Sequence, residues 1–366
     1  MTTIIIGAGA SGLACAIRLK QKCPSAEVIV LERLSQSGKK ILATGNGRCN
    51  FTNTNADGSD EVIAFFNSIG LKEKYEDEGR VYPYSNQAAT VLEQMLSACE
   101  QLGVEIVTDC TVESIDSDLC VSTDCGMYMA DCIVVASGGM AQSSLGSNGS
   151  GHKLLKDIGH TITPLYPALV QLTSSSRHTR ALKGCRAKCE LKILLDDECV
   201  AAECGEVLFT DYGLSGIVTM NLSVHVAKSF AQDNPKKCHA VLDLAPDISE
   251  NELLEHARRF GGLDGVLGSR LSGILLKQAG GDIERLAKFA KSWKLIITGT
   301  KGFDYAQITA GGAQLTEFDG FRSRLVPRVY ACGEVLDRQF KCGGYNLNFA
   351  FYSGIKTADE IAVVAE

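Results

Sequence analysis

Three glycines near the N-terminus, Gly7, Gly9 and Gly12, form a pattern that can cradle a pyrophosphate. An apolar run precedes them, a helical pattern opens among them, and a second apolar run ends at Glu32. Gly7 permits a tight turn, Gly9 lets the backbone approach a phosphate, and Gly12 lets the helix pack closely on the strand. The helix N-terminus favours an anion, and the Glu32 carboxylate can accept hydrogen bonds from a ribose diol. This unit therefore predicts a bound dinucleotide, and an acid at this position disfavours the 2′-phosphate of NADP.

The elements that position this turn alternate as strand, helix and strand over residues 2–31, which predicts one βαβ unit. A loop rich in Gly, Asn and Thr, too polar to form an element of its own, follows over residues 35–60. A helical pattern covers 88–101, and short strand patterns run from 104 to 131. An apolar strand then enters a glycine turn at 136–139. The first part of the chain is expected to be a sheet with a small meander attached.

The pattern changes in the second half of the chain. Residues 167–247 are mostly strand-like, whereas residues 249–291 are rich in Leu, Ala, Arg and Lys at helical spacing, with Ser249 as the expected N-cap. After Trp293 the strand patterns resume, and a last strand, loop and helix follow. The predicted fold class is α/β, with a Rossmann-like domain, an inserted β domain and a helical subdomain. The predicted domain limits are 1–167 with 301–366, 168–247 with 293–300, and 248–292.

Length and charge limit the classes of function. A chain of 366 residues is expected to hold two or three domains, and 45% apolar with 22% charged residues is typical of a globular protein. The formal charge of −7 offers no basic surface for a polyanion, so we expect a small-molecule substrate and no nucleic acid. No stretch has the length of a membrane span, and the apolar N-terminus lacks the basic region of a secretory leader. We expect a cytoplasmic protein that does not bind a membrane, and the oligomeric state stays open.

The 15 cysteines are odd in number and scattered, which favours a reducing compartment in which most are buried thiols. No two of them have the two-residue spacing of a zinc site, so no metal is expected. In the first long loop Cys49 stands alone, whereas disulfide reductases place two cysteines there, four residues apart. Thiol-disulfide exchange at the cofactor is therefore not expected, and Cys332 and Cys342 receive no role.

Ordered blocks over essentially the whole chain resemble the BaiN-like family of bacterial FAD proteins. This family includes proteins described as aminoacetone oxidases and as reductases of unsaturated oxo-steroids. The resemblance implies that the Rossmann unit binds FAD, and the long loop and meander in place of further βαβ units agree with it. The blocks read GAGASGLACA, GKKILATGNGRCNFTN, GRVYPYSNQAATVL, GEVLFTDYGLSG, ITAGGAQ, ACGEVLD and CGGYNLNFAFYSG.

The resemblance implies FAD contacts from segments far apart in the sequence. The loop 39–53 is similar to the family loop that wraps FAD, where Lys40 or Arg48 would neutralise phosphate or be a solvated loop cation. Glu334 matches a position that holds the ribityl chain, and Val112 matches one that packs on adenine or hydrogen-bonds it through the backbone. A helix opening at 343–346 would face the flavin N1 and C2 carbonyl edge. The expected FAD-binding residues are Gly7, Gly9, Ala10, Ser11, Gly12, Glu32, Arg33, Lys40, Thr44, Gly45, Asn46, Asn50, Val112, Ala136, Ser137, Gly138, Gly333, Glu334, Gly343, Gly344, Tyr345 and Asn346.

The catalytic residue is not identified by the sequence. The candidates are aromatic or acidic residues within the family-like blocks, and they are Tyr82, Tyr84, Asp211, Tyr212 and Tyr345. Departures from the family pattern gather on the substrate side. Asp211 stands where relatives have His, Ile217 where they often have Pro, and GGMAQSSLGSNGSG where many have a Gly-Ser-Thr-Gly-Asp-Gly string. The resemblance therefore supports FAD binding more strongly than it supports any particular substrate.

The expected function is that of an FAD-dependent oxidoreductase with hydride transfer through flavin N5. No second strand-GxGxxG-helix unit is present, so NAD(P)H as electron donor would have to dock without a Rossmann domain of its own. Reduction of a small unsaturated or imine-like substrate is the preferred reaction. An amine or aminoketone oxidase that uses oxygen, an NAD-dependent dehydrogenase without flavin, and a flavin-binding module with a sensory or tRNA-modifying partner are the alternatives.

Overall fold

The computed structural model describes residues 1–116 and 118–365, and the chain folds as two compact units. The first unit joins Met1–Leu165 to Ile308–Glu366, and the second is Tyr166–Gln307. The predicted limits of the three domains remain a prediction beside this division into two. None of the described helices combines the length and the apolar character that crossing a bilayer requires.

Within the described part of the first unit, a seven-stranded sheet has the order β19-β20-β21-β10-β1-β2-β6. The strands from β21 to β6 pair in parallel, and β19 and β20 are antiparallel at one edge. This arrangement confirms the Rossmann-like α/β class. The strands are β1 (Thr2–Ile6), β2 (Glu27–Leu31), β6 (Glu105–Val107), β10 (Cys132–Val135), β19 (Phe318–Asp319), β20 (Arg322–Ser323) and β21 (Val329–Ala331).

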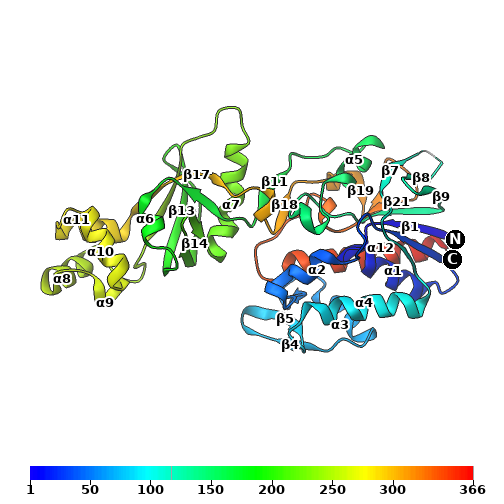
Figure 1. The fold of residues 1–366 in the computed structure, drawn as a ribbon, viewed down its shortest axis with the longest axis horizontal. Helices are drawn as coiled ribbons and strands as arrows, with labels where there is room; N and C mark the ends of the chain where they lie inside the picture. Colours follow the sequence, from blue (N-terminus) through cyan, green and yellow to red (C-terminus); the bar gives the residue numbers. More distant parts are fainter. Residues whose placement is uncertain (117, 366) are drawn as a thin grey trace. The chain divides into compact units, whose positions relative to one another are not determined.

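Apolar side chains cover both faces of this sheet, as a parallel sheet requires. Ile5, Val30 and Val134 lie in one core with helices α1, α3, α4 and α12, whereas Ile4 and Ile133 lie in a second core with α5 and the meander. Figure 1 shows α1 and α12, the first and last helices of the chain, beside each other. The helices are α1 (Ala10–Lys22), α3 (Ser59–Ser68), α4 (Ala88–Leu102), α5 (Ser150–Asp157) and α12 (Tyr345–Ala365), and the meander is β7 (Val112–Ile115), β8 (Cys120–Thr123) and β9 (Gly126–Met129).

The prediction that residues 35–60 form no element of their own is wrong. The segment contains helix α2 (Lys39–Ala43), the 3-10 helix η1 (Thr44–Gly47) and strand β3 (Thr52–Asn53), and α3 begins at Ser59. Strand β3 pairs with β5 (Arg80–Pro83), which in turn pairs with β4 (Glu73–Tyr75). These elements are too short for periodicity to reveal, and burial of Ile41 and Phe51 in the core holds them.

Strands β12 to β17 of the second unit close into a barrel with the order β12-β15-β14-β13-β16-β17, and β11 (Tyr166–Ala168) lies outside it. The expected helical stretch is confirmed, and α8 begins with a capping box in which Ser249 and Glu252 bond reciprocally. The elements of the barrel and its helices are β12 (Leu172–Ser174), β13 (Arg186–Leu195), β14 (Glu198–Phe209), β15 (Gly213–Ser215), β16 (Cys238–Asp243), β17 (Trp293–Thr300), α6 (Arg177–Ala181), α8 (Glu250–Phe260), α9 (Asp264–Leu267), α10 (Ser269–Gln278) and α11 (Ile283–Lys291).

Helix α7 (Ile217–Phe230) is an exception within residues 167–247, where the sequence predicts mostly strand and the structure has β12 to β16. Its sequence is apolar on most sides and contains several β-branched residues, a composition that favours a strand when it is read locally. Val218, Leu222 and Val226 recur at helical spacing and pack into the core of the barrel. Tertiary burial therefore outweighs local propensity in this segment.

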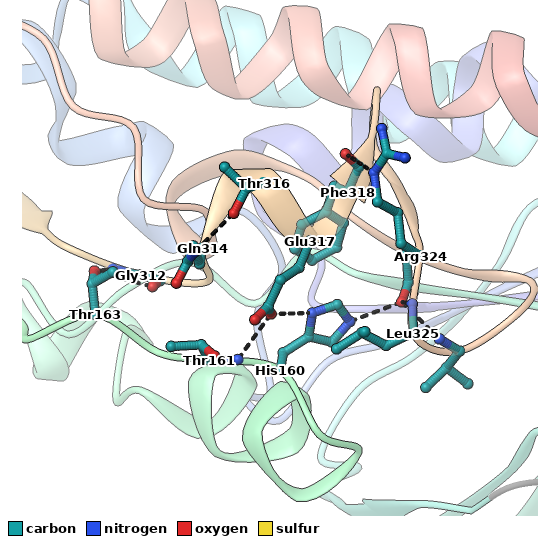
Figure 2. Close-up of polar contacts among 12 residues, drawn as sticks. His160, Thr161, Thr163, Gly312, Gln314, Thr316, Glu317, Phe318, Arg324 and Leu325 are labelled. Carbon is teal, nitrogen blue, oxygen red and sulfur yellow. Dashed lines mark hydrogen bonds and ion pairs between the residues drawn. The ribbon is translucent and has the colours of Figure 1, made fainter.

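A buried histidine joins two loops of the first unit (Figure 2). His160 Nδ1 lies 3.0 Å from Glu317 Oε2, and its Nε2 lies 2.9 Å from Ser323 Oγ. The imidazole stacks on Phe318 with ring centroids 4.6 Å apart, and Thr161 N donates to the same Glu317 oxygen at 2.9 Å. These contacts fasten the segment after α5 to the turn before β19.

We expect Glu317→Gln to lower the free energy of unfolding by about 2 kcal/mol at pH 7, as for a lost charged hydrogen bond. Burial opposes ionisation, but hydrogen bonds from Thr161 and His160 outweigh it and hold the pKa of Glu317 below its usual 4.5. A lowered carboxyl pKa stabilises the fold above 4.5, and this contribution is lost as the pH falls through the folded-state pKa. Urea unfolding followed by circular dichroism from pH 7 to 3 should show the difference shrinking below pH 4.5, whereas a constant difference would contradict the assignment.

Candidate functional site

Four loops meet at the carboxyl edge of the parallel sheet. They follow β1, β2, β10 and β21 and begin at Gly7, Glu32, Ala136 and Cys332. Backbone hydrogen bonds of 2.8 to 3.1 Å join the starts of these loops to neighbouring strand ends. The chain passes from β1 to β2 on one side, whereas β10 lies on the other side of β1. Ligands of open α/β sheets bind at such a switch in strand order, so this edge is the candidate cofactor site.

The three glycines of the first loop have different structural roles. Gly7 has a φ of +107°, and a Cβ there would lie 2.8 Å from the carbonyl oxygen of Ala136. A Cβ at Gly12 would lie 2.0 Å from the carbonyl oxygen of Gly7. Gly9 has an ordinary φ of −88°, and its Cβ position has no neighbouring atom within 4 Å. Gly7 and Gly12 thus close the turn, whereas Gly9 faces open space.

The open space lies at the start of α1, where the N-cap residue is Gly9 and no side chain caps the helix. The amides of Ala10, Ser11 and Gly12 occupy the first turn, where a helix supplies no internal acceptor, and they point the positive end of the helix dipole outward. Gly333, with a φ of +78°, packs so closely that a Cβ there would lie 2.5 Å from Ser11 Oγ. This cradle of small residues and free amides fits a pyrophosphate.

Glu32 joins two of the loops through its carboxylate. Its Oε2 accepts from Ala8 N at 2.9 Å, and its Oε1 accepts from Leu34 N at 2.8 Å. Each oxygen retains acceptor capacity, which is what a ribose diol requires. Arg33 donates to the carbonyl oxygen of Gly146 at 3.1 Å, so its guanidinium serves the loop after the 3-10 helix η3 (Ser143–Leu145).

We expect Glu32→Gln to weaken FAD binding about tenfold. The NH2 group of glutamine cannot accept a hydrogen bond from a backbone amide, and a hydrogen bond to a charged group is worth about 1.5 to 3 kcal/mol. Titration of the apoprotein with FAD, followed by flavin fluorescence, measures the change. Glu105→Gln is the matched control, because Glu105 is an exposed acid on the neighbouring strand β6. Equal affinity in both variants would reject the role of Glu32.

The loop 39–53 lies against the start of α12, although the two segments are about 290 residues apart in the sequence. Asn53 Nδ2 donates to the carbonyl oxygen of Gly343 at 2.9 Å, and Thr52 Oγ1 donates to Asn348 Oδ1 at 2.6 Å. Gly344 has a φ of +96°, and a Cβ there would lie 2.7 Å from the carbonyl oxygen of Thr52. The structure therefore brings together the loop and the helix start that the sequence separates.

Several predicted side chains in these segments hold the protein's own backbone. Thr44 Oγ1 donates to Ile41 O at 2.6 Å, Asn50 Oδ1 accepts from Val81 N at 3.2 Å, and Asn346 bonds to both the amide and the carbonyl of Phe340. Gly45 and Asn46 both have a φ of +55°, so η1 is interrupted by left-handed backbone. Tyr345 is the first residue of α12. The amides and glycines of this region, more than its side chains, are left to face a cofactor.

Of the two predicted loop cations, one lies at the sheet edge and the other is engaged elsewhere. Lys40 Nζ lies 2.9 Å from Glu334 Oε2, and Glu334 Oε1 accepts from Thr309 N at 2.7 Å. Arg48 instead pairs with Glu76 and lies 4.1 Å above the ring of Tyr82. These contacts favour Lys40 over Arg48 as the cation that neutralises phosphate.

Two polar groups near the end of β10 are shielded from solvent, the Oγ atom of Ser137 in the loop after this strand and the side chain of His152 in α5. Among the residues that the structure describes, Ser137 Oγ makes no hydrogen bond, and neither ring nitrogen of His152 makes a well-formed one, although the backbone of Val335 lies nearby. Gly138 follows with a φ of +74°, and a Cβ at Gly151, beside His152, would lie 1.9 Å from Ser137 Oγ. Burial lowers the pKa of His152, and the nearby Glu334 carboxylate opposes that shift. Orphaned polar atoms of this kind fit a site that is completed by a polar ligand.

His152 was not among the residues predicted from the sequence. Its signal was present in GSNGSGH, where a small-residue string runs into a helix and ends in a titratable side chain. That string does not match a second dinucleotide motif, and no local pattern reveals that α5 packs beside the Glu334 loop. Sequence spacing alone therefore could not place this imidazole at the edge.

The remaining predicted residues are spread over both units. Val112 opens β7 and is half-buried, two residues beyond Cys110, whose amide donates to Glu32 O at 3.0 Å. Tyr82 is buried and Tyr84 is 73% exposed, and with Tyr345 they belong to the first unit.

Asp211 and Tyr212 belong to the second unit. A hydrogen bond from Lys183 lowers the pKa of Asp211, and Lys301 Nζ lies 4.6 Å from the Tyr212 ring. These contacts assign a catalytic role to neither residue, so the catalytic candidates stay predictions.

Comparison with known proteins gives matches over almost the whole chain. The family model described as the HI0933-like protein Rossmann domain matches residues 1–60 and 57–360. The 3-dehydro-bile acid delta(4,6)-reductase of Clostridium scindens is 34% identical over 396 residues and covers 96% of each chain. The ribosomal RNA dihydrouridine synthase of Escherichia coli is 26% identical and covers 98% of this chain and 97% of its own.

Solved structures share the fold at low sequence identity. A 3-ketosteroid delta1-dehydrogenase from Sterolibacterium denitrificans has a TM-score of 0.55 at 11% identity, covering 99% of this chain and 100% of its own. A flavocytochrome c3 fumarate reductase in an open conformation has a TM-score of 0.51 at 15% identity, covering 100% of this chain and 78% of its own. At these identities the likeness concerns the fold alone.

Proposed function

Since this chain belongs to the HI0933-like protein Rossmann domain family and is an FAD-dependent oxidoreductase, we propose that it reduces an electron-poor double bond in a small organic molecule. The observation that carries the proposal is the 34% identity, over nearly the full length, to a reductase that acts on an unsaturated oxo-steroid acid. The proposed substrates are α,β-unsaturated ketones and related imines. NAD(P)H is the proposed electron donor.

The residues at the sheet edge support this proposal through binding and orientation. FAD, when bound, supplies the hydride-transferring N5 atom. The amides at the start of α1 would hold the pyrophosphate, Glu32 the ribose, and Lys40 would place a positive charge beside Glu334 at the same edge. The backbone amides at the start of α12 would lie beside the flavin N1 and C2 carbonyl edge, and a helix N-terminus stabilises negative charge there.

The test is an anaerobic one. The oxidised holoprotein is mixed with NADH or NADPH, and the visible absorbance of the flavin is followed before and after addition of an α,β-unsaturated oxo-steroid. A reductase should bleach with one of the nucleotides and recover its colour as the steroid is reduced. If neither nucleotide bleaches the flavin but an aminoketone does, with peroxide formed in air, the oxidase alternative replaces the proposal.

A second candidate is reduction of a uracil ring within RNA. Two relatives named ribosomal RNA dihydrouridine synthase, 26% and 25% identical, match 98% of this chain, whereas its net charge of −7 opposes binding of a polyanion. The absence of a nucleic-acid partner therefore stays a prediction. Ribosomal RNA added to the same assay separates the two, because dihydrouridine in digested RNA would favour the second candidate.

A further inference from the structure

Two cysteines of the first unit lie in contact beside the meander. Cys110 precedes β7, Cys125 lies in the turn between β8 and β9, and their Sγ atoms are 2.6 Å apart. Cys110 is 1% exposed, whereas Cys125 is exposed to solvent. A small oxidant can therefore reach the Cys125 sulfur directly, whereas the Cys110 sulfur is buried and in contact with it.

The surroundings make the two thiols unequal. Hydrogen bonds from Cys110, from Thr123 Oγ1 at 3.3 Å and from Tyr128 OH at 3.9 Å lower the pKa of Cys125. Burial raises the pKa of Cys110. The thiolate is the reactive form of cysteine, so the exposed Cys125 has the character of an attacking sulfur and Cys110 that of a resolving thiol.

We propose that Cys110 and Cys125 form a dithiol that hydrogen peroxide oxidises to a disulfide. The Cys125 thiolate attacks one peroxide oxygen, the O–O bond breaks, and the departing hydroxide takes a proton to leave as water. Cys110 sulfur then attacks the sulfenic sulfur of Cys125, its proton leaves with the hydroxyl as a second water, and the S–S bond forms. Two thiols and one peroxide thus give one disulfide and two waters.

A metal site explains this cluster less well. Asp124 is the third possible ligand, and the three ligand atoms lie within 4.8 Å of one another. Asp124 Oδ1 already accepts from Thr111 N at 2.7 Å. Two thiolates bound to one tetrahedral zinc at about 2.3 Å each would lie about 3.8 Å apart, so the sulfurs would have to separate, whereas a disulfide draws them together.

The disulfide would act on the candidate cofactor site through one loop. Cys110 N donates to Glu32 O at 3.0 Å, and Asp109 N donates to Leu34 O at 3.2 Å. The new bond would therefore fasten the meander turn to the strand end that carries Glu32. The inference does not depend on which substrate the protein reduces.

The experiment treats the reduced holoprotein, freed of reductant, with a small excess of hydrogen peroxide. Two of the 15 thiols should be lost and the mass should fall by two hydrogens. Digestion with a protease that cleaves after Asp and Glu should release residues 110–113 linked to residues 125–131. The opposite result is a wild-type digest in which both peptides stay alkylatable, and it would overturn the proposal without any variant.

Variants assign the order of the two sulfurs. Cys125→Ser should abolish the linked peptide and slow peroxide consumption by thiols at least tenfold, whereas Cys110→Ser should leave a sulfenic acid at 125 that dimedone traps. Cys199→Ser, which removes another exposed cysteine, is the matched control and should keep the link. Stoichiometric zinc that is lost in Cys125→Ser and blocks oxidation of the wild type would replace the dithiol with a metal site.

Discussion

Replacing Gly9 with valine should yield a folded protein that does not retain FAD. The φ of Gly9 is −88°, which any residue adopts, and its Cβ position has no neighbour within 4 Å, so the fold has no steric reason to fail. The two methyl groups would instead occupy the space above the amides of α1, where the pyrophosphate is expected. We expect an increase of at least about 100-fold in the dissociation constant of FAD, or about 2.7 kcal/mol.

Absorbance of the purified variant and FAD titration of its apoprotein measure this effect. Gly273→Val is the matched control, because the Cβ position of this glycine in α10 is also without neighbours and lies in the second unit. It should purify with the flavin content of the wild type. Full flavin occupancy in folded Gly9→Val would show that the phosphate does not lie at the start of α1.

Replacing Gly12 with alanine should instead damage the fold itself. A single Cβ would lie 2.0 Å from the carbonyl oxygen of Gly7, and both groups belong to backbone that the sheet and α1 hold in place. Overpacking against rigid atoms costs about 1 to 3 kcal/mol and can exceed that range. We expect a loss of at least about 3 kcal/mol, which is a large part of the stability of most domains.

Urea unfolding of the apoprotein, followed by circular dichroism, separates this effect from cofactor loss. Gly9→Ala is the control, since it adds the same methyl group three residues earlier without a contact. It should unfold within about 0.5 kcal/mol of the wild type, as for a surface substitution. Equal unfolding midpoints for the two alanine variants would mean that the turn can accommodate a methyl group at Gly12. That result would contradict the role assigned to Gly12 in the close packing of helix and strand.

The sequence alone identifies the parts of this protein whose form depends on near neighbours. The βαβ unit follows from apolar periodicity and three glycines within a dozen residues, and α4 and the capped α8 follow from helical spacing and Ser249. These features depend on backbone sterics and on contacts three or four residues apart. Their physical causes are contained in short windows of sequence, so the first half of the cofactor site could be predicted from it.

Tertiary structure decides the pairings. Lys40 meets Glu334 across 294 positions of sequence, and Asn53 meets Gly343 across 290, because the order of parallel strands places the loops after β1, β2, β10 and β21 at one edge. The same packing buries His152 near Glu334 and places Cys110 against Cys125. No local pattern carries this information, since the strand order is set by which apolar faces are buried together over the whole unit.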